Sequence, residues 1–231
     1  EDAMTFHFYY ASADADSLET LAEKLDVNMS DVPEWLYQPY KAWDILSTKS
    51  MVKVRPGKEI WITEFNLSDH ERPTHGYWTH GLFQALQTLL LLQDERITKV
   101  TPHGMCGTAV YASHFYDTEG FEFGNGEDAS FIPPPVKPAT TFWGLTATGN
   151  NLMMVGKSMN NKSYASQIQF SPNPQVMTIE KGDTIYYNGL FGFLFNNNNS
   201  TDVALLNLTG TAQTINTAAM FPSGGTYEMR H

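Results

Sequence analysis

Cysteine is almost absent from this chain. Cys106 stands alone among 231 residues, which excludes an intrachain disulfide framework and a thiolate metal cluster. Basic residues are also few, because 14 Lys and Arg stand against 25 Asp and Glu and give a formal net charge of −11. Nucleic acids and anionic membranes are bound through basic patches. We therefore expect neither as a partner.

Long apolar runs are missing as well. Leu89–Leu92 is one apolar patch in an amphipathic pattern, and no run approaches the roughly 18 apolar residues of a membrane span. Charged residues make up only 17% of the chain, and aromatic residues make up 13%. This composition favours a secreted or periplasmic carbohydrate-active protein, with a signal peptide that is not in this chain. Because a strand pattern follows Glu1 almost at once, we expect the N-terminus to be a cut.

The first part of the chain alternates between strand and helix patterns. Residues 3–10, 59–65 and 97–103 are β-favouring segments. Helical spacing appears at residues 17–25 and, most clearly, at 79–95, where polar residues such as Gln84 and Gln87 separate the apolar positions. The order of strand, helical crossover and strand predicts a parallel α/β arrangement.

Side chains suited to chemistry lie where these strands end. Glu64 follows a run of apolar and β-branched residues, and β/α proteins place catalytic groups at the C-terminal ends of parallel strands. His7 and Tyr9 share one side of their strand by the two-residue period, and His103 ends the third segment. We expect these four side chains to meet at one end of the strands. Tyr10 takes the place of Tyr9 if the alternation is shifted by one residue.

Plainer interpretations of these residues are open. Glu64 can form a salt bridge or cap the next helix, and the aromatic residues of segment 3–10 can pack a core. His70, His75 and His80 are five residues apart, a spacing that does not place ligands on one face of a helix. We therefore expect neither a metal nor a cofactor, and the three histidines contact sugar hydroxyls or solvent.

Beyond about residue 150 the pattern becomes strand-like. Short β-rich stretches between Asn, Gly and Pro turns predict an antiparallel β-sandwich. Residues 140–148, which include Trp143, are expected to form the last helix before it. We therefore predict two domains, residues 1–149 and 150–231. The expected strands are residues 152–155, 164–170, 175–179, 184–187, 190–195, 203–208 and 213–217.

The segment Ile60-Trp61-Ile62-Thr63-Glu64-Phe65-Asn66 resembles the seventh strand of a large group of retaining glycoside hydrolases. This is clan A, whose (β/α)8 barrels include α-L-arabinofuranosidases, β-xylosidases and β-agarases. The His-x-Tyr pattern of His7 and Tyr9 is similar to the end of the clan's sixth strand. The run Val203–Leu208 resembles a strand of the β-sandwich that these enzymes append. The resemblance implies the C-terminal portion of a TIM (β/α)8 barrel followed by a β-sandwich.

By this resemblance Glu64 is the nucleophile, and Tyr9 or Tyr10 orients it. The residues expected to contact the sugar are His7, Tyr9, Tyr10, Asn66, His103 and Trp143. The clan's acid/base is a Glu that follows an Asn at the end of strand four, and this sequence contains no Asn-Glu dipeptide. The resemblance thus implies a fragment of a retaining glycosidase for a plant or algal polysaccharide or oligosaccharide, which needs the missing N-terminal part of the barrel and is inactive alone.

Two other classes of function are open. A non-catalytic carbohydrate-binding or scaffolding protein would keep the aromatic loops and would be indifferent to Glu64. A different β/α enzyme would use Glu64 to bind a ligand or a metal, so its activity would depend on that metal.

Overall fold

The computed structural model describes most of the chain, in separate ranges. These are residues 2–10, 32–67, 78–103, 106–107, 115–116, 144–145, 147–197, 199–218, 220–221 and 229. The helix expected at residues 17–25 lies outside the described residues, as do His70, His75 and most of residues 104–138. The chain divides into two compact units, Glu1–Leu152 and Met153–His231.

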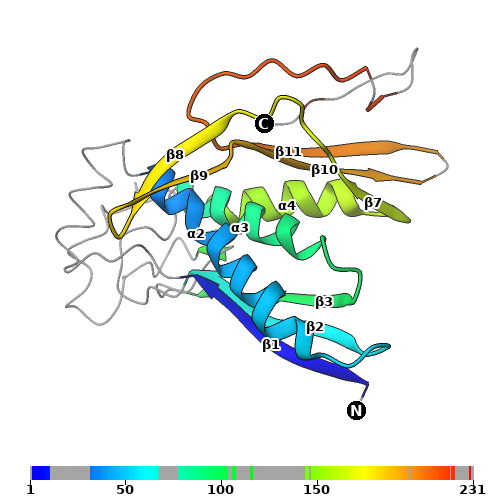
Figure 1. The fold of residues 1–231 in the computed structure, drawn as a ribbon. Helices are drawn as coiled ribbons and strands as arrows, with labels where there is room; N and C mark the ends of the chain where they lie inside the picture. Colours follow the sequence, from blue (N-terminus) through cyan, green and yellow to red (C-terminus); the bar gives the residue numbers. More distant parts are fainter. Residues whose placement is uncertain are drawn as a thin grey trace. The chain divides into compact units, whose positions relative to one another are not determined.

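The first unit is built on a three-stranded parallel sheet (Figure 1). Its order is β1-β2-β3, and the described residues form no closed barrel. The predicted positions of these strands and their parallel pairing are confirmed. The strands are β1 (Ala3–Tyr10), β2 (Glu59–Leu67) and β3 (Ile97–Pro102), and the described helices between them are α2 (Val32–Ile45), η1 (Leu46–Ser50), η2 (Met51–Lys53) and α3 (Trp78–Leu91).

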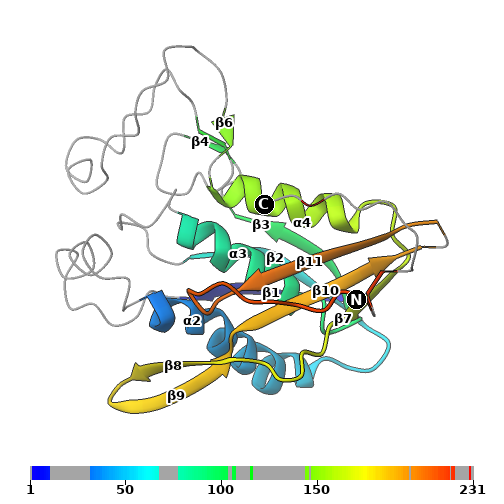
Figure 2. The same cartoon turned by 90° about the horizontal axis from the view of Figure 1, so that it is seen from above.

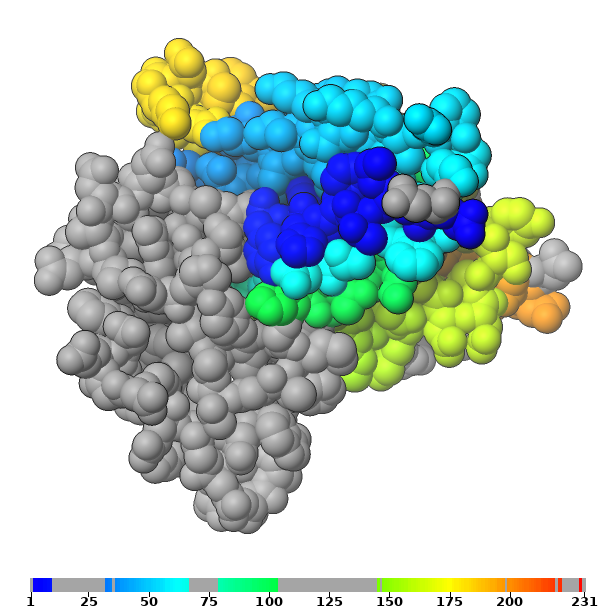
Figure 3. Space-filling model, turned by 90° about the horizontal axis from the view of Figure 1, so that it is seen from below, coloured from blue at the N-terminus to red at the C-terminus, as the bar shows by residue number. Residues whose placement is uncertain are grey.

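The core of this unit lies on the helix-covered face of the sheet. Side chains from all three strands pack there against the helical crossovers, and most are almost completely removed from water. Figure 3 shows the opposite face, on which β1 (blue), β2 (cyan) and β3 (green) lie at the surface. The buried residues of this core cluster are Phe8, Leu46, Met51, Val54, Ile60, Ile62, Phe65 and Leu91.

Helix α3 is buried more completely than its sequence pattern predicts. Its 14 residues include no acidic or basic side chain except His80, so it has no strongly solvated stripe. Gln84 and Gln87, expected on a polar face, are fully buried. The helix also ends at Leu91 instead of near residue 95. The lack of Asp, Glu, Lys and Arg in this segment is the feature of the sequence that indicates burial of both glutamines.

Helix α4 (Ala147–Met159) corrects two expectations. Of the helix predicted at residues 140–148, Gly144 and Leu145 are in a strand and Ala147 and Thr148 are in α4, and the strand predicted at residues 152–155 is the middle of this helix. A four-residue apolar run does not distinguish a strand from a buried helix segment by periodicity. Three two-residue strands precede α4 in one small sheet, namely β4 (Cys106–Gly107), β5 (Phe115–Tyr116) and β6 (Gly144–Leu145).

The second unit contains antiparallel strands, as predicted. β10 pairs with β11 and with β7, which Figure 2 shows side by side, and β8 pairs with β9. Phe191, Phe193 and Phe195 of β10 are buried; the rings of Phe193 and Phe195 are stacked, and the ring of Phe191 is tilted against that of Phe193. The strand predicted at residues 213–217 is not formed. The strands are β7 (Tyr164–Gln167), β8 (Gln175–Glu180), β9 (Asp183–Asn188), β10 (Leu190–Asn196) and β11 (Thr201–Asn207).

An ion pair closes the turn between α3 and β3. Arg96 Nε and Nη2 donate to the two carboxylate oxygens of Asp94 at 2.9 and 2.6 Å, and Nη1 donates to the carbonyl of Met51 at 3.4 Å. The hydrogen bonds from the Arg96 side chain lower the pKa of Asp94 below its ordinary value. A carboxyl group whose pKa is lower in the folded state stabilises that state above its unfolded pKa, and the stabilisation is lost as the pH falls.

We therefore expect Asp94→Asn to reduce the free energy of unfolding at neutral pH. The loss should be no more than about 1 kcal/mol, because solvent reaches the pair. The gap between wild type and variant should narrow as the pH falls below about 4, through the native pKa of Asp94. Denaturant unfolding across this pH range measures the gap, and Arg96→Gln should reproduce the trend. A gap that widens in acid would contradict this assignment.

Candidate functional site

Glu64 is the centre of a polar cluster on the open face of the parallel sheet. The Tyr9 hydroxyl donates to Glu64 Oε2 at 2.8 Å, and His7 Nδ1 lies 3.4 Å from the same oxygen. Glu64 Oε1 makes no hydrogen bond to the described part of the chain. The side chains of Glu64 and His7 are 38% and 58% exposed. The carboxylate therefore has one oxygen held by protein, and its side chain is partly open to solvent.

A β-bulge places Glu64 on this face. In the pairing with β1, Phe6 lies opposite Ile62 and His7 lies opposite Glu64, so Thr63 has no partner. The pairing with β3 is irregular at the same place, because Ile62 lies opposite Val100 and Phe65 lies opposite Pro102, three residues apart on β2 but two residues apart on β3. The buried apolar positions of β2 are accordingly Ile60, Ile62 and Phe65 instead of a regular alternation. The extra residue turns Glu64 away from the helices, as bulges next to functional sites often do.

His103 joins the cluster from the end of β3. Its Nδ1 atom lies 2.9 Å from the Tyr9 hydroxyl. The His103 backbone N–H donates to the carbonyl of Phe65 at 3.1 Å, which ties the end of β3 to β2 next to Glu64. The structure thus brings together the four side chains that the strand ends predicted, and the two-residue alternation of His7 and Tyr9 is confirmed. β2 continues to Leu67, so Glu64 precedes the end of its strand.

Asn66 lies behind this cluster. Its side chain is fully buried, and its Nδ2 donates to the carbonyl of His103 at 3.0 Å. Its Oδ1 accepts from Gln84 Nε2 at 2.6 Å and lies 3.0 Å from His80 Nε2, both on α3. Asn66 was expected to contact the sugar, but burial directs its amide to protein groups. His80, expected to contact sugar hydroxyls or solvent, is fully buried in α3, and sequence patterns did not identify its contact with Asn66.

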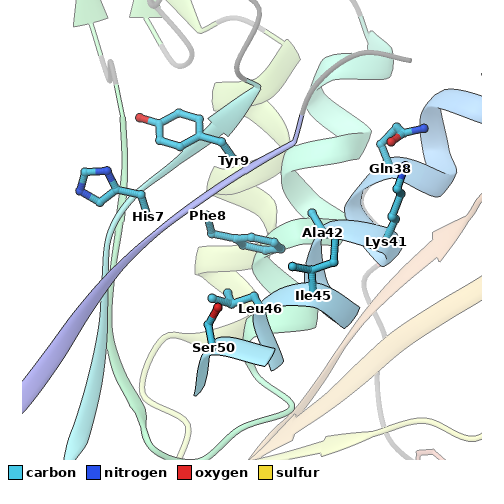
Figure 4. A pocket seen from close by; sticks show the side chains of 9 residues that line it. All are labelled: His7, Phe8, Tyr9, Gln38, Lys41, Ala42, Ile45, Leu46 and Ser50. Carbon is cyan, nitrogen blue, oxygen red and sulfur yellow. The ribbon is translucent and has the colours of Figure 1, made fainter. Parts of the chain in front are cut away.

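A hollow of about 330 Å³ borders the cluster between β1 and the α2–η1 segment. Figure 4 shows His7 and Tyr9 directed to one side of β1 and Phe8 directed toward the helical residues. Apolar side chains, among them Ala42 and Leu46, form part of its lining. His7 and Tyr9 are also among the lining residues, but their side chains are directed to the other side of β1 from Phe8, and Glu64 does not line the hollow.

Glu59, the other glutamate of β2, is engaged differently. Its Oε2 accepts hydrogen bonds from Trp61 Nε1 and Thr98 Oγ1, both at 2.8 Å. The hydrogen bond from Trp61, and then the one from Thr98, lower the pKa of Glu59. Lys99 Nζ lies 5.1 Å from the centre of the Trp61 ring, a cation–π contact. The Glu59 carboxylate is thus hydrogen-bonded to neighbouring strand residues, which makes Glu59 a useful control position for substitutions of Glu64.

The remaining expected residues are not all described. Tyr10 belongs to β1, but its side chain lies outside the described residues, as does the whole of Trp143. The part of the chain that the structure describes contains no cluster of three His, Cys, Asp or Glu side chains able to hold a metal ion. None of its helices is long and apolar enough to cross a membrane.

In comparisons with known proteins, no family model, no curated protein and no solved structure matches this chain. The chemistry of the site therefore rests on its geometry and on the residues themselves. A half-exposed carboxylate with one oriented oxygen, flanked by a phenol and two imidazoles, is equipped to attack an electrophilic carbon or to accept a proton.

Proposed function

We propose that this chain carries the nucleophile side of a retaining glycoside hydrolase, with Glu64 as the nucleophile. The asymmetry of its carboxylate carries the proposal, because Oε2 accepts from Tyr9 while Oε1 makes no hydrogen bond to the described residues. A nucleophilic carboxylate needs one oxygen directed at the anomeric carbon and a fixed orientation. The resemblance of the Glu64 segment to strand seven of the clan agrees with this role.

The acid/base residue of the proposed enzyme lies elsewhere. Retaining glycosidases hold their two carboxyl groups about 5 to 5.5 Å apart. Within the described ranges Glu64 contacts no second carboxylate. We propose that β1, β2 and β3 are strands six to eight of a (β/α)8 barrel, and that its missing N-terminal part supplies the acid/base. The antiparallel strands of the second unit then belong to the appended β-sandwich, and this chain alone is inactive.

The proposed substrate is a plant or algal polysaccharide or oligosaccharide, encountered in a secreted or periplasmic setting. The formal net charge of −11 fits a neutral polymer better than an anionic one. The hollow beside β1 combines polar groups such as Gln38 and Lys41 with apolar side chains. Ligand sites commonly combine these two kinds of surface, and sugar rings present both hydroxyl groups and C–H faces.

Covalent trapping tests the nucleophile directly. A 2-deoxy-2-fluoro glycoside with a dinitrophenolate leaving group reacts without much help from a general acid, and its fluorine slows hydrolysis of the intermediate. We expect mass spectrometry to find one fluoroglycosyl group on the peptide that contains Glu64. Glu64→Gln should abolish labelling, and Glu59→Gln on the same strand should keep it.

Labelling of another carboxylate would show that Glu64 is not the nucleophile. Sugar binding that survives Glu64→Gln, with no labelling and no turnover in the protein with a complete barrel, would instead support a carbohydrate-binding or scaffolding protein. Activity that disappears with a chelator would support the metal-dependent alternative.

A further inference from the structure

The Tyr9 hydroxyl has one proton, and its contacts include two groups of the described residues that can share a hydrogen bond with it. Glu64 Oε2 lies 2.8 Å away and His103 Nδ1 lies 2.9 Å away. An ionised carboxylate only accepts hydrogen bonds, so the phenolic proton is directed to Glu64. The Tyr9 oxygen must then accept from the imidazole. Both contacts are satisfied together only when His103 carries a proton on Nδ1.

The position of His103 is set through its backbone. Its N–H donates to the carbonyl of Phe65 at 3.1 Å, and its carbonyl accepts from Asn66 Nδ2 at 3.0 Å. Phe65 and Asn66 directly follow Glu64 within β2. His103 and Glu64 therefore share one rigid backbone connection and one side-chain connection, the latter through Tyr9.

The amide of Asn66 is itself fixed by α3. Its Oδ1 accepts from Gln84 Nε2 at 2.6 Å, and His80 Nε2 lies 3.0 Å from the same oxygen, so His80 carries a proton on Nε2. All three side chains are fully buried. Removing one partner of a buried hydrogen bond destabilises the folded state, because the other group is left buried and unsatisfied. This cost favours one arrangement of the whole set of side chains. Residues of α3 thus fix the orientation of the Asn66 amide, and the Asn66 amide in turn holds the backbone carbonyl of His103.

We propose that His103 is a positioning residue for Glu64. Its Nδ1–H occupies the acceptor side of the Tyr9 oxygen, which leaves the phenolic proton directed to the carboxylate. It acts through Tyr9, not on a reacting atom, whereas the sequence alone placed it in contact with the sugar. The predicted effect of His103 on turnover rests on the proposed function. The hydrogen-bond arrangement itself does not, because it can be measured without any substrate.

The test is the tautomer of each histidine, read from the ¹⁵N chemical shifts of the imidazole rings at mildly alkaline pH. We expect His103 to hold its proton on Nδ1 and His80 to hold its proton on Nε2. Tyr9→Phe removes the acceptor, so the Nδ1–H preference of His103 should be lost while His80 stays unchanged as the internal control. His103 protonated on Nε2 in the wild type, or an unchanged tautomer in Tyr9→Phe, would overturn the proposal.

Turnover by the protein with a complete barrel supplies the second measurement. His103→Leu should lower kcat about tenfold with little change in KM, the scale of one lost hydrogen bond. His103→Asn, which keeps an N–H close to the position of Nδ1, should recover most of that loss. Equal losses in both variants would overturn the positioning role. Wild-type protein with the Nδ1–H tautomer but no glycosidase turnover would overturn the proposed function alone.

Discussion

Turnover of an activated aryl glycoside should fall on the order of 10⁴- to 10⁶-fold when Glu64 is replaced by glutamine, the scale seen when a covalent nucleophile is removed from an enzyme. The amide has nearly the same shape, and its oxygen still accepts the hydrogen bond that Tyr9 donates to Glu64. It lacks the negative charge needed to attack the anomeric carbon. The loss should therefore appear in kcat/KM while the fold is retained.

Two comparisons make this result specific to Glu64. Glu59→Gln changes a glutamate of the same strand that is bound to Trp61 and Thr98, and its activity should match the wild type. The isolated chain should not hydrolyse an unactivated glycoside at an enzymatic rate, because general acid catalysis, typically worth about 10² to 10⁴ in rate, is missing. Robust turnover by the isolated chain that Glu64→Gln does not change would place the chemistry elsewhere.

Gly81→Ala should destabilise the first unit by about 1–3 kcal/mol, the usual cost of an overpacked contact. Gly81 lies in the first turns of α3, and a Cβ there would be 2.7 Å from the carbonyl oxygen and 2.8 Å from the carbonyl carbon of Ala147. It would also lie 2.5 Å from Asn151 Nδ2. Two of these atoms are backbone at the start of α4, so a side-chain rotation cannot relieve the contact.

Gly156→Ala is the matched control for this substitution. Gly156 lies inside α4, is exposed, and has no atom within 4 Å of the position of a Cβ. The same chemical change should therefore stabilise the helix by about 0.5–1 kcal/mol, because alanine loses less backbone entropy than glycine. Denaturant unfolding of both variants measures the contrast. Equal effects of the two substitutions would show that α3 and α4 do not approach closely at Gly81.

Strands β1, β2 and β3 could be predicted because their β-favouring residues and polar ends are local features. The meeting of Glu64, His7, Tyr9 and His103 followed from the rule that parallel strands bring their C-terminal ends together. The role of Asn66 could not be predicted, because it depends on which residues of α3 face the end of β2. The residue type alone does not distinguish an asparagine that binds a ligand from one whose amide bonds to buried helix side chains.

Short apolar runs were the other source of error. Residues 152–155 fit a strand and a helix equally well, and only packing decides between them. Buried Gln84 and Gln87 were misplaced because polar residues between leucines normally face water. In the second unit, strands bounded by turn residues were located within a few positions, since Asn, Gly and Pro act through local backbone preferences.

Thr63 is an extra residue that β2 accommodates as a bulge. A substitution at residue 63 leaves the count between Ile62 and Phe65 unchanged, so Glu64 keeps its side of the sheet. Losing this one residue would restore strict alternation along β2 and would still leave Ile62 and Phe65 on the core side and Glu64 on the open side, because successive side chains of a strand point to opposite faces. Over evolutionary time this strand can therefore lose the bulged residue without moving its carboxylate into the core.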